Sequence, residues 1–312
     1  MERTRAAVRR TWPTRLERAR SGGLMVRKVL VAGARGMLGT DLCALLERRG
    51  WQVVAADIGE FDITDARATH AFVKDHLPSV IINCAAYTAV DQAESDREAA
   101  FLVNRDGARH LAEAAVATKA SMVHLSTDYV FDGTKNGPYA EDDEPNPRNL
   151  YGESKLAGEA AVREALAEHY IVRSAWLYGI HGKSFPRTML RLAREGRALR
   201  VVSDQKGSPT YTEHLAEALA AVIEKPLYGT YHAVDGGFCT WYELACEVFR
   251  AAGVRAEVRP ITTAEYPTPA RRPANSMLDT TKLRKCYGVA MPDWRAGVAA
   301  FCEKWKREPA EA

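Results

Sequence analysis

A short apolar run that leads into a glycine-rich turn constrains the fold of this chain more than any other feature. The run begins at Lys28, and three glycines at a spacing of three follow it: Gly33, Gly36 and Gly39. Leucines then recur on one face of a helical period. This order predicts a strand, a tight turn and a helix whose first N–H groups can approach a pyrophosphate. The spacing is GxxGxxG and not GxGxxG, so a purely structural turn remains an alternative.

Further apolar runs alternate with helical patterns along the first half of the chain. The runs have the length of strands and lie at 53–56, at 80–86, and from Ser121 and Tyr170 onward. Helical patterns cover 97–118 and 151–168. Strands that alternate with helices predict a parallel sheet covered on both faces. We therefore expect an α/β protein with a Rossmann-like doubly wound parallel sheet, in which the glycine turn binds a dinucleotide.

The second half of the chain is less regular and predicts a smaller C-terminal lobe. Helical patterns lie near 184–195, 212–224, 241–252 and 293–306, separated by proline-bearing loops. We assign residues 25–178 and about 212–233 to an NAD(P)-binding domain. Residues from about 179 to 211 and from 234 to 312 are assigned to a substrate-binding lobe.

The net positive charge of the chain comes from its first residues. Residues 1–24 hold seven Arg and two Glu, a local balance of +5, and since the whole chain carries +3, the remainder carries −2. We expect a disordered basic extension there, with a transit-type peptide as the alternative. The mildly acidic body gives no reason to expect nucleic-acid binding. No stretch approaches the roughly 18 uninterrupted apolar residues of a membrane span, so no membrane partner is expected.

The cysteines give information about the cellular compartment. The chain has 6 Cys, none of them in a CxxC pair or at zinc-binding spacing. Most lie in apolar surroundings, where Cys is usually a small buried side chain. These features indicate a reducing compartment, and we expect the cytoplasm.

An aspartate lies where an acidic side chain can accept hydrogen bonds from an adenosine ribose. Asp57 ends the second predicted strand, about twenty residues after the glycine turn. A carboxylate there disfavours a 2′-phosphate and favours NADH, although Arg35 in the turn could offset it. The alternative is a solvated aspartate at a strand end. Asp62 and Ile63 follow and could flank the adenine.

The strongest local signal is the pair Tyr151 and Lys155, which are four residues apart in a predicted helix and therefore project side by side. An ammonium beside a phenol lowers the phenol pKa, so the tyrosine can exchange a proton with a substrate oxygen. The predicted strand before this helix ends at Ser126 and Thr127, whose hydroxyls could bond the same oxygen. YxxxK alone is common by chance, but its place after a glycine turn makes the combination specific.

At this point the chain resembles the extended short-chain dehydrogenases and, within them, the dTDP-4-dehydrorhamnose reductases. The resemblance runs from about Val29 to Trp294. Seven segments carry it, in order: GARGMLG (33–39), NCAAYTAVDQAE (83–94), STDYVFDG (126–133), YGESKLAGE (151–159), RSAWLYG (173–179), DQKGSPT (204–210) and PTPARRPANSMLDT (267–280).

The resemblance implies roles for individual residues. It implies a catalytic triad of Thr127, Tyr151 and Lys155. Residues implied to line the dinucleotide, together with Gly33, Tyr151 and Lys155, are Gly36, Met37, Leu38, Asp57, Asp62, Ile63, Ala85, Ala86 and Tyr87. Residues implied to contact the substrate, together with Thr127 and Tyr151, are Asp128, Trp176 by stacking on the sugar ring, and Arg272 and Asn275 near the nucleotide.

The implied reaction is reduction of the C4 ketone of dTDP-4-dehydro-β-L-rhamnose with NADH or NADPH as cofactor and Tyr151 as general acid. Related dehydratases carry Thr-Asp-Glu where this chain has Tyr129 after Thr-Asp, which argues against dehydration. Two alternatives remain: a reductase of another nucleotide-linked keto sugar, and a non-catalytic binder like the beta subunit of methionine adenosyltransferase.

The sequence gives less information about metal binding and the oligomeric state. Some members of this reductase family dimerise through magnesium held by glutamates, and Asp41 and Glu213 lie near such positions. Carboxylates on helix faces are usually solvated, so we assign no metal. We expect a monomer or a homodimer.

Overall fold

A computed structural model describes residues 27–308. The expected α/β class is confirmed, because a six-stranded sheet with parallel pairing throughout lies at the centre of the fold. The predicted basic extension, residues 1–24, lies outside the described residues.

The central sheet has the strand order β10-β5-β4-β3-β1-β2. Its strands are β1 (Lys28–Ala32), β2 (Gln52–Ala56), β3 (Val80–Asn83), β4 (Ser121–Thr127), β5 (His169–Ser174) and β10 (Gly229–His232). The chain passes from β1 to the edge strand β2 and then crosses to β3 on the other side of β1. Such a reversal opens a crevice at the carboxyl ends of the strands.

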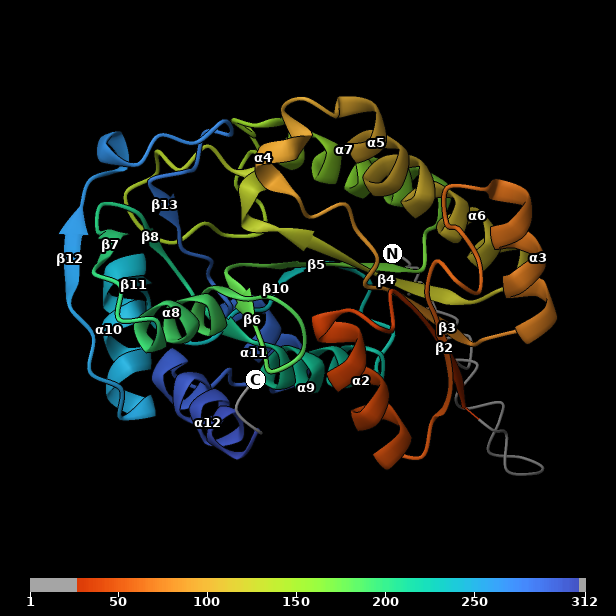
Figure 1. The fold of residues 1–312 in the computed structure, drawn as a ribbon. Coiled ribbons are helices and arrows are strands. Elements are labelled where there is room, and N and C mark those ends of the chain that lie inside the picture. The colour runs from red at the N-terminus through yellow and green to blue at the C-terminus, as the bar shows by residue number, and fades with distance from the viewer. Residues whose placement is uncertain (1–26, 309–312) are drawn as a thin grey trace, which may run out of the picture.

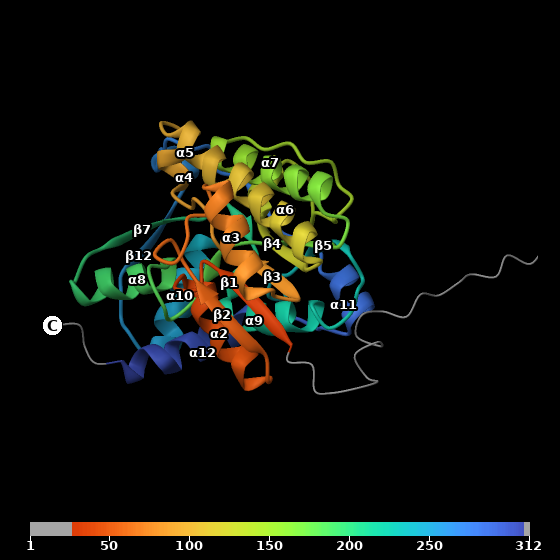
Figure 2. The same ribbon diagram turned by 90° about the vertical axis from the view of Figure 1, so that its right-hand side faces the viewer.

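Helices cover both faces of this sheet, as Figures 1 and 2 show. On one face lie α2 (Met37–Arg48), α9 (Thr212–Val222) and α11 (Thr281–Tyr287), whose leucine and alanine side chains pack on β1 and β3. On the other face lie α3 (Ala66–His76), α6 (Ala108–Thr118) and α7 (Leu150–Ala165), packed on β1, β3 and β4. Burial of apolar side chains on both faces explains the continuous apolar runs of the strands.

The predicted helix over 97–118 is interrupted. It consists of α5 (Arg97–Phe101), a π-helical segment η2 (Leu102–Gly107) and α6. The wider turn places the buried Asn104 amide against the loop after β3, where it accepts the Tyr87 N–H at 2.9 Å and donates to the Ser154 hydroxyl at 2.9 Å. The π turn therefore ties that loop to α7, a placement that helical periodicity does not reveal.

Short helices with few buried positions are also missing from the sequence prediction. Helix α3 begins after Asp65, whose carboxylate accepts the N–H groups of Arg67 and Ala68, and it buries only Thr69 and Val73. So few apolar positions give no clear helical period. The same holds for α4 (Val90–Ala93) and α11.

A second apolar core lies beside the sheet, on the left in Figure 1. Its helices are α8 (Phe185–Arg194), α10 (Trp241–Ala252) and α12 (Trp294–Arg307), close to the predicted positions. Its strands are short: β6 (Leu177–Tyr178), β7 (Leu199–Val202), β8 (Lys206–Gly207), β9 (Thr210–Tyr211), β11 (Cys239–Thr240), β12 (Val258–Ile261) and β13 (Asn275–Ser276). Side chains such as Leu190, Leu244 and Phe301 are buried between them.

Candidate active site

A cavity of about 1030 Å³ opens at the carboxyl ends of the sheet strands. Most of the residues singled out from the sequence line it: Gly33, Gly36, Met37, Leu38, Asp57, Asp62, Ile63, Ala85, Ala86, Tyr87, Thr127, Asp128, Tyr151, Lys155 and Trp176. The fold therefore brings the glycine turn, the YxxxK helix and Trp176, which are far apart in sequence, into one space.

The glycine turn has the geometry of an anion cradle. Gly33 has φ of +76°, and a Cβ there would lie 2.6 Å from the Ala85 backbone nitrogen, so a larger residue does not fit. Gly36 precedes the first turn of α2, and no side chain of the described residues caps it. The free N–H groups of this helix end face the cavity and suit the pyrophosphate of a dinucleotide.

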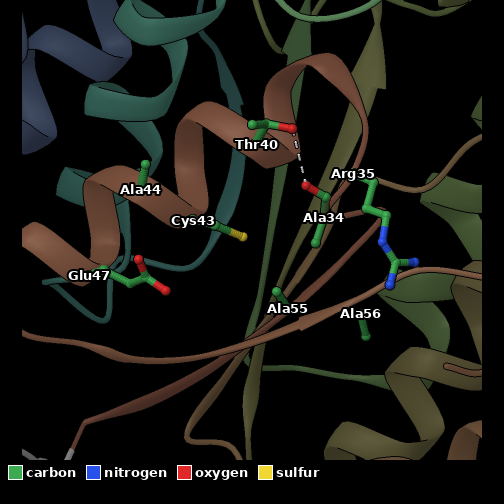
Figure 3. Close-up of a pocket in the computed structure, with 8 residues that line it drawn as sticks. All are labelled: Ala34, Arg35, Thr40, Cys43, Ala44, Glu47, Ala55 and Ala56. Carbon is green, nitrogen blue, oxygen red and sulfur yellow. Dashed lines mark hydrogen bonds between the residues drawn. The ribbon is translucent and has the colours of Figure 1, made fainter.

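A second, smaller cavity of about 410 Å³ lies between α2 and β2, on the outer side of the same turn (Figure 3). Its lining includes Thr40, Cys43 and Glu47 of α2. Burial raises the pKa of the Cys43 thiol to about 11, which makes it a poor nucleophile at neutral pH. Arg35 lines both cavities, and its side chain extends away from Cys43 in Figure 3.

Helix α7 presents Tyr151 and Lys155 to the large cavity. The helix begins after Asn149, whose side chain accepts the Gly152 N–H at 2.8 Å. A Cβ on Gly152 would lie 2.2 Å from the Tyr129 carbonyl oxygen, so this glycine lets the start of α7 approach the loop after β4. Cap and glycine together fix where Tyr151 enters the site.

The environment of Tyr151 differs from the expectation that Lys155 lowers the pKa of its phenol. Burial is the dominant effect and raises that pKa to about 12, while the nearby Thr127 side chain acts in the opposite direction. The phenol therefore stays protonated at neutral pH. A neutral phenol beside a hydroxyl is suited to donate a proton to a substrate oxygen.

Lys155 is hydrogen-bonded to the backbone of strand β4. Its ammonium is buried and donates to the Leu125 carbonyl oxygen at 2.5 Å. Burial lowers the pKa of Lys155 to about 8, and the nearby Glu159 carboxylate counteracts that effect. Lys155 therefore titrates close to physiological pH.

Glu159 lies one further turn along α7 and is the centre of a buried polar network. Its carboxylate accepts Arg173 Nε at 2.8 Å and Nη2 at 2.7 Å, and the Ser126 hydroxyl at 2.5 Å. Glu159 is completely buried, and Arg173 is 2% exposed. The network joins α7 to β4 and β5 directly behind Lys155. Neither Glu159 nor Arg173 was expected in the site from the sequence, because a buried ion pair has no local sequence pattern.

Thr127 and Asp128 supply polar groups opposite Tyr151. The Thr127 hydroxyl donates to Asp128 Oδ1 at 2.9 Å, and burial raises the pKa of Asp128 to about 6. Within residues 27–308, Asp128 Oδ2 and the hydroxyl of Ser174 are buried without a hydrogen-bond partner. Both residues line the cavity, and Ser174 is adjacent to Thr127 across the β4–β5 pairing. Unsatisfied buried groups of this kind suit a polar ligand.

Trp176 stacks on a second tryptophan. The Trp176 and Trp241 rings lie 3.6 Å apart at 9°, both line the cavity, and Trp176 has a left-handed backbone with φ of +46°. Gly207 packs against the Trp176 ring, where a Cβ would clash at 2.3 Å. Trp241 was not expected in the site, because its place at the start of a helix resembles an ordinary core position. Tyr129 is a further unexpected member of the lining, edge-on to Tyr151 at 5.6 Å.

Arg272 and Asn275 are not among the residues that line the cavity. Arg272 pairs with both oxygens of Asp91, at 2.9 and 2.8 Å. The Asn275 amide donates to the carbonyl oxygens of Lys135 and Gly137, each at 2.7 Å. In this arrangement both side chains hold loops in place, and their predicted contact with a nucleotide stays a prediction.

Asp41 and Glu213 are engaged by protein groups. The Asp41 carboxylate accepts the Thr212 hydroxyl, and Glu213 pairs with Lys304. Among residues 27–308 no cluster of three or more His, Cys, Asp or Glu side chains is arranged to hold a metal ion. No helix in this part of the chain is long and apolar enough to cross a membrane.

Comparison with known proteins agrees with this geometry. A protein named dTDP-4-dehydrorhamnose reductase from Streptomyces griseus is 47% identical over 276 residues, covering 86% of this chain and 91% of that protein. A Streptomyces antibioticus protein, named as a probable dTDP-4,6-dihydroxy-2-methyloxan-3-one 4-ketoreductase, is 44% identical over 86% of this chain and 92% of its own length.

The fold is also shared with solved structures. The crystal structure of dTDP-4-dehydrorhamnose reductase from Bacillus anthracis in complex with NADP superposes with a TM-score of 0.88 at 40% identity, over 90% of this chain and 100% of that one. A family model described as the RmlD substrate binding domain matches residues 27–307, nearly all of the described chain. The chain therefore belongs to the RmlD substrate binding domain family.

Proposed function

We propose that this protein is an oxidoreductase that reduces the C4 ketone of dTDP-4-dehydro-β-L-rhamnose to dTDP-β-L-rhamnose with NADH or NADPH. The observation that carries the proposal is a protonated Tyr151 phenol that lines the same cavity as Thr127 and an uncapped glycine-turn helix end. The relatives of the family that bear this name support the choice of substrate. We also propose that the chain divides into a cofactor-binding domain and a substrate-binding lobe.

The glycine turn and the loop after β3 would hold the dinucleotide, which supplies a hydride to the ketone carbon when bound. Gly33 allows the close approach of backbone to ligand, and the first N–H groups of α2 face the pyrophosphate. Ala85, Ala86 and Tyr87 form the opposite wall, and Asn104 fixes that wall by bonding the Tyr87 N–H.

Tyr151 would donate the proton that the ketone oxygen needs. Burial keeps its phenol neutral, and Thr127 lines the same cavity, so both groups can converge on one oxygen. Lys155, one turn along α7, carries a positive charge below about pH 8 and would stabilise the phenolate that remains. Trp176, which is stacked on Trp241 and packed against Gly207, would contact the sugar from the wall of the cavity.

Tyr129 argues for reduction and against elimination of water. Its ring lies edge-on to Tyr151, and burial raises the pKa of its phenol well above the usual range. A phenol so difficult to ionise cannot serve as the base that removes a proton from a sugar carbon. The arrangement therefore supports hydride transfer without dehydration.

The direct test is an assay with purified protein, the dTDP-4-keto sugar, and NADH or NADPH. We expect loss of absorbance at the reduced-nicotinamide band and a dTDP-rhamnose product. Tyr151→Phe serves as the paired negative control, since it keeps the ring but removes the proton. Absence of turnover with both cofactors, in a protein that is folded by circular dichroism, would refute the proposal.

A second candidate is a reductase of a different dTDP-linked keto sugar. It is favoured by the 44% identical relative from Streptomyces antibioticus, whose name specifies another 4-ketoreductase substrate. A panel of dTDP-4-keto sugars separates the two candidates. The better substrate is the one with the higher kcat/KM, and a value at least about tenfold higher for another sugar would favour this second candidate.

A further inference from the structure

We infer that Glu60 is a specificity residue for the cofactor. Its carboxylate pairs with the Arg35 guanidinium beside the adenosine ribose, so that this cation is not available to a 2′-phosphate, and NADPH is disfavoured relative to NADH. The inference rests on the proposed function, because it concerns the same dinucleotide site. Asp57 alone does not settle the preference, since a free Arg35 in the glycine turn could attract a 2′-phosphate and offset the Asp57 charge.

The loop after β2 holds Glu60 in a defined position. The loop turns back on itself, with the Glu60 N–H donating to the Asp57 carbonyl oxygen at 2.9 Å. The Glu60 carboxylate in turn accepts the Asp57 N–H at 2.8 Å. This reciprocal pair of hydrogen bonds directs the carboxylate towards the glycine turn. There each carboxylate oxygen accepts a hydrogen bond from one terminal nitrogen of the Arg35 guanidinium.

Arg35 is fixed at both ends. Its backbone N–H donates to Asp57 Oδ2 at 3.0 Å, and its guanidinium lies over Gly59, within 3.5 Å of where a Cβ on that glycine would be. Arg35 lines the large cavity together with Asp57, so its guanidinium is close to the expected ribose position. The bidentate partner uses two of the five N–H groups and offsets the positive charge that would attract a phosphate.

The charged side chains around the expected adenosine ribose favour a ribose without a 2′-phosphate. Asp57 and Asp62 line the cavity with Arg35, and Glu60 pairs with that arginine, so the four side chains carry a formal charge of −2. The hydrogen bond between Arg35 and Glu60 lowers the pKa of Glu60 and raises that of Arg35, so both side chains remain charged at neutral pH. A 2′-phosphate adds roughly −1.5 to −2 at neutral pH and is repelled, whereas a ribose hydroxyl can donate to Asp57.

The test compares equilibrium dissociation constants of NADH and NADPH, measured without substrate by the fluorescence of the reduced nicotinamide. We expect the wild type to bind NADH more tightly than NADPH. In Glu60→Gln, Arg35 is released and one negative charge is lost, so NADPH should bind about tenfold more tightly, with NADH changed less than about twofold. An unchanged ratio of the two constants would overturn the inference.

The chain offers a matched control in Glu265. This residue likewise accepts a backbone N–H three positions earlier, that of Thr262 at 2.8 Å, and pairs with an arginine, Arg200. Its partner Arg200, unlike Arg35, does not line the large cavity. Glu265→Gln should leave both dissociation constants unchanged, and a shift equal to that of Glu60→Gln would show a general charge effect and overturn the inference.

A double variant distinguishes two causes of tighter NADPH binding: release of the Arg35 guanidinium from Glu60, and loss of the repulsion between the Glu60 carboxylate and the 2′-phosphate. In Arg35→Gln with Glu60→Gln, the gain in NADPH affinity should disappear, because the phosphate has lost its cation. If the gain persists, Arg35 is not involved and the inference is wrong. If the wild type binds neither nucleotide, the proposed function itself fails, whereas binding of both with an unaltered ratio in Glu60→Gln removes only the role of Glu60.

Discussion

Replacing Glu159 with Gln removes the negative charge at the centre of the buried network behind Lys155. The carboxylate is completely buried and accepts two hydrogen bonds from Arg173, one from Arg163 and one from Ser126. The variant leaves Arg173, which is 2% exposed, as a buried charge without its counterion. Breaking one side of such a pair costs about 3–5 kcal/mol of folding free energy.

The pH dependence of the free energy of unfolding gives a second measure of what the Glu159 carboxylate contributes to stability. Burial alone raises the pKa of Glu159, but the bonds from Arg173 and Ser126 outweigh it and bring that pKa down to about 2. An unfolded Glu titrates near about 4.3, and the difference corresponds to about 3 kcal/mol. Because the folded pKa is the lower one, this stabilisation is complete above about pH 4.3 and is lost as the pH falls towards about 2.

Urea denaturation at pH 7 measures the loss, and a series between pH 7 and pH 3 follows its pH dependence. We expect Glu159→Gln to unfold more easily by at least about 3 kcal/mol and to have a shallower dependence of stability on acid. The matched control is Glu195→Gln, which breaks an exposed pair with Arg191 and should cost no more than about 0.5 kcal/mol. A loss below about 1 kcal/mol in Glu159→Gln would refute the reasoning.

Four further predictions concern the site. Tyr151→Phe should lower kcat at least about 100-fold while the NADH dissociation constant, measured by fluorescence, changes less than about twofold; equal loss of both would contradict a proton-donor role. The rate should fall as pH rises through about 8, where Lys155 loses its proton, and a pH profile flat to about 10 would exclude that role. Trp241→Leu should raise the sugar KM about three- to tenfold through loss of the stacked ring, with kcat little changed, and an unchanged KM would argue against a Trp platform. Gly33→Ala should weaken binding of either nucleotide in calorimetry and cost at least about 1 kcal/mol of stability, and normal binding would contradict the cradle.

Much of the cofactor side of the site is predictable from sequence, because its determinants are local. The glycine turn after an apolar run indicates strand, turn and helix, and the spacing of Tyr151 and Lys155 places both on one face of α7. Their meeting in one cavity follows from the parallel sheet, whose carboxyl ends share an edge.

The parts that were not predictable depend on contacts between distant segments. Trp241 reaches Trp176 across 65 positions of sequence, and the π turn at Asn104 is needed only because it bonds Tyr87 and Ser154. The expected influence of Lys155 on Tyr151 rested on spacing alone and did not include burial, which dominates the phenol pKa. Two-residue strands such as β8 and β13 are similarly invisible, because their pairing is set by tertiary structure.

Transfer of a labelled hydride shows directly whether the protein reduces the sugar ketone with the nicotinamide cofactor. NADH deuterated on the transferred position of nicotinamide C4 is incubated with the protein and dTDP-4-dehydro-β-L-rhamnose, and the product is examined by NMR and mass spectrometry. We expect dTDP-β-L-rhamnose with one deuterium, bound to sugar C4, and none in the Tyr151→Phe reaction over the same time. A product without deuterium at C4, or oxidation of NADH without a reduced sugar, would contradict the proposed reduction.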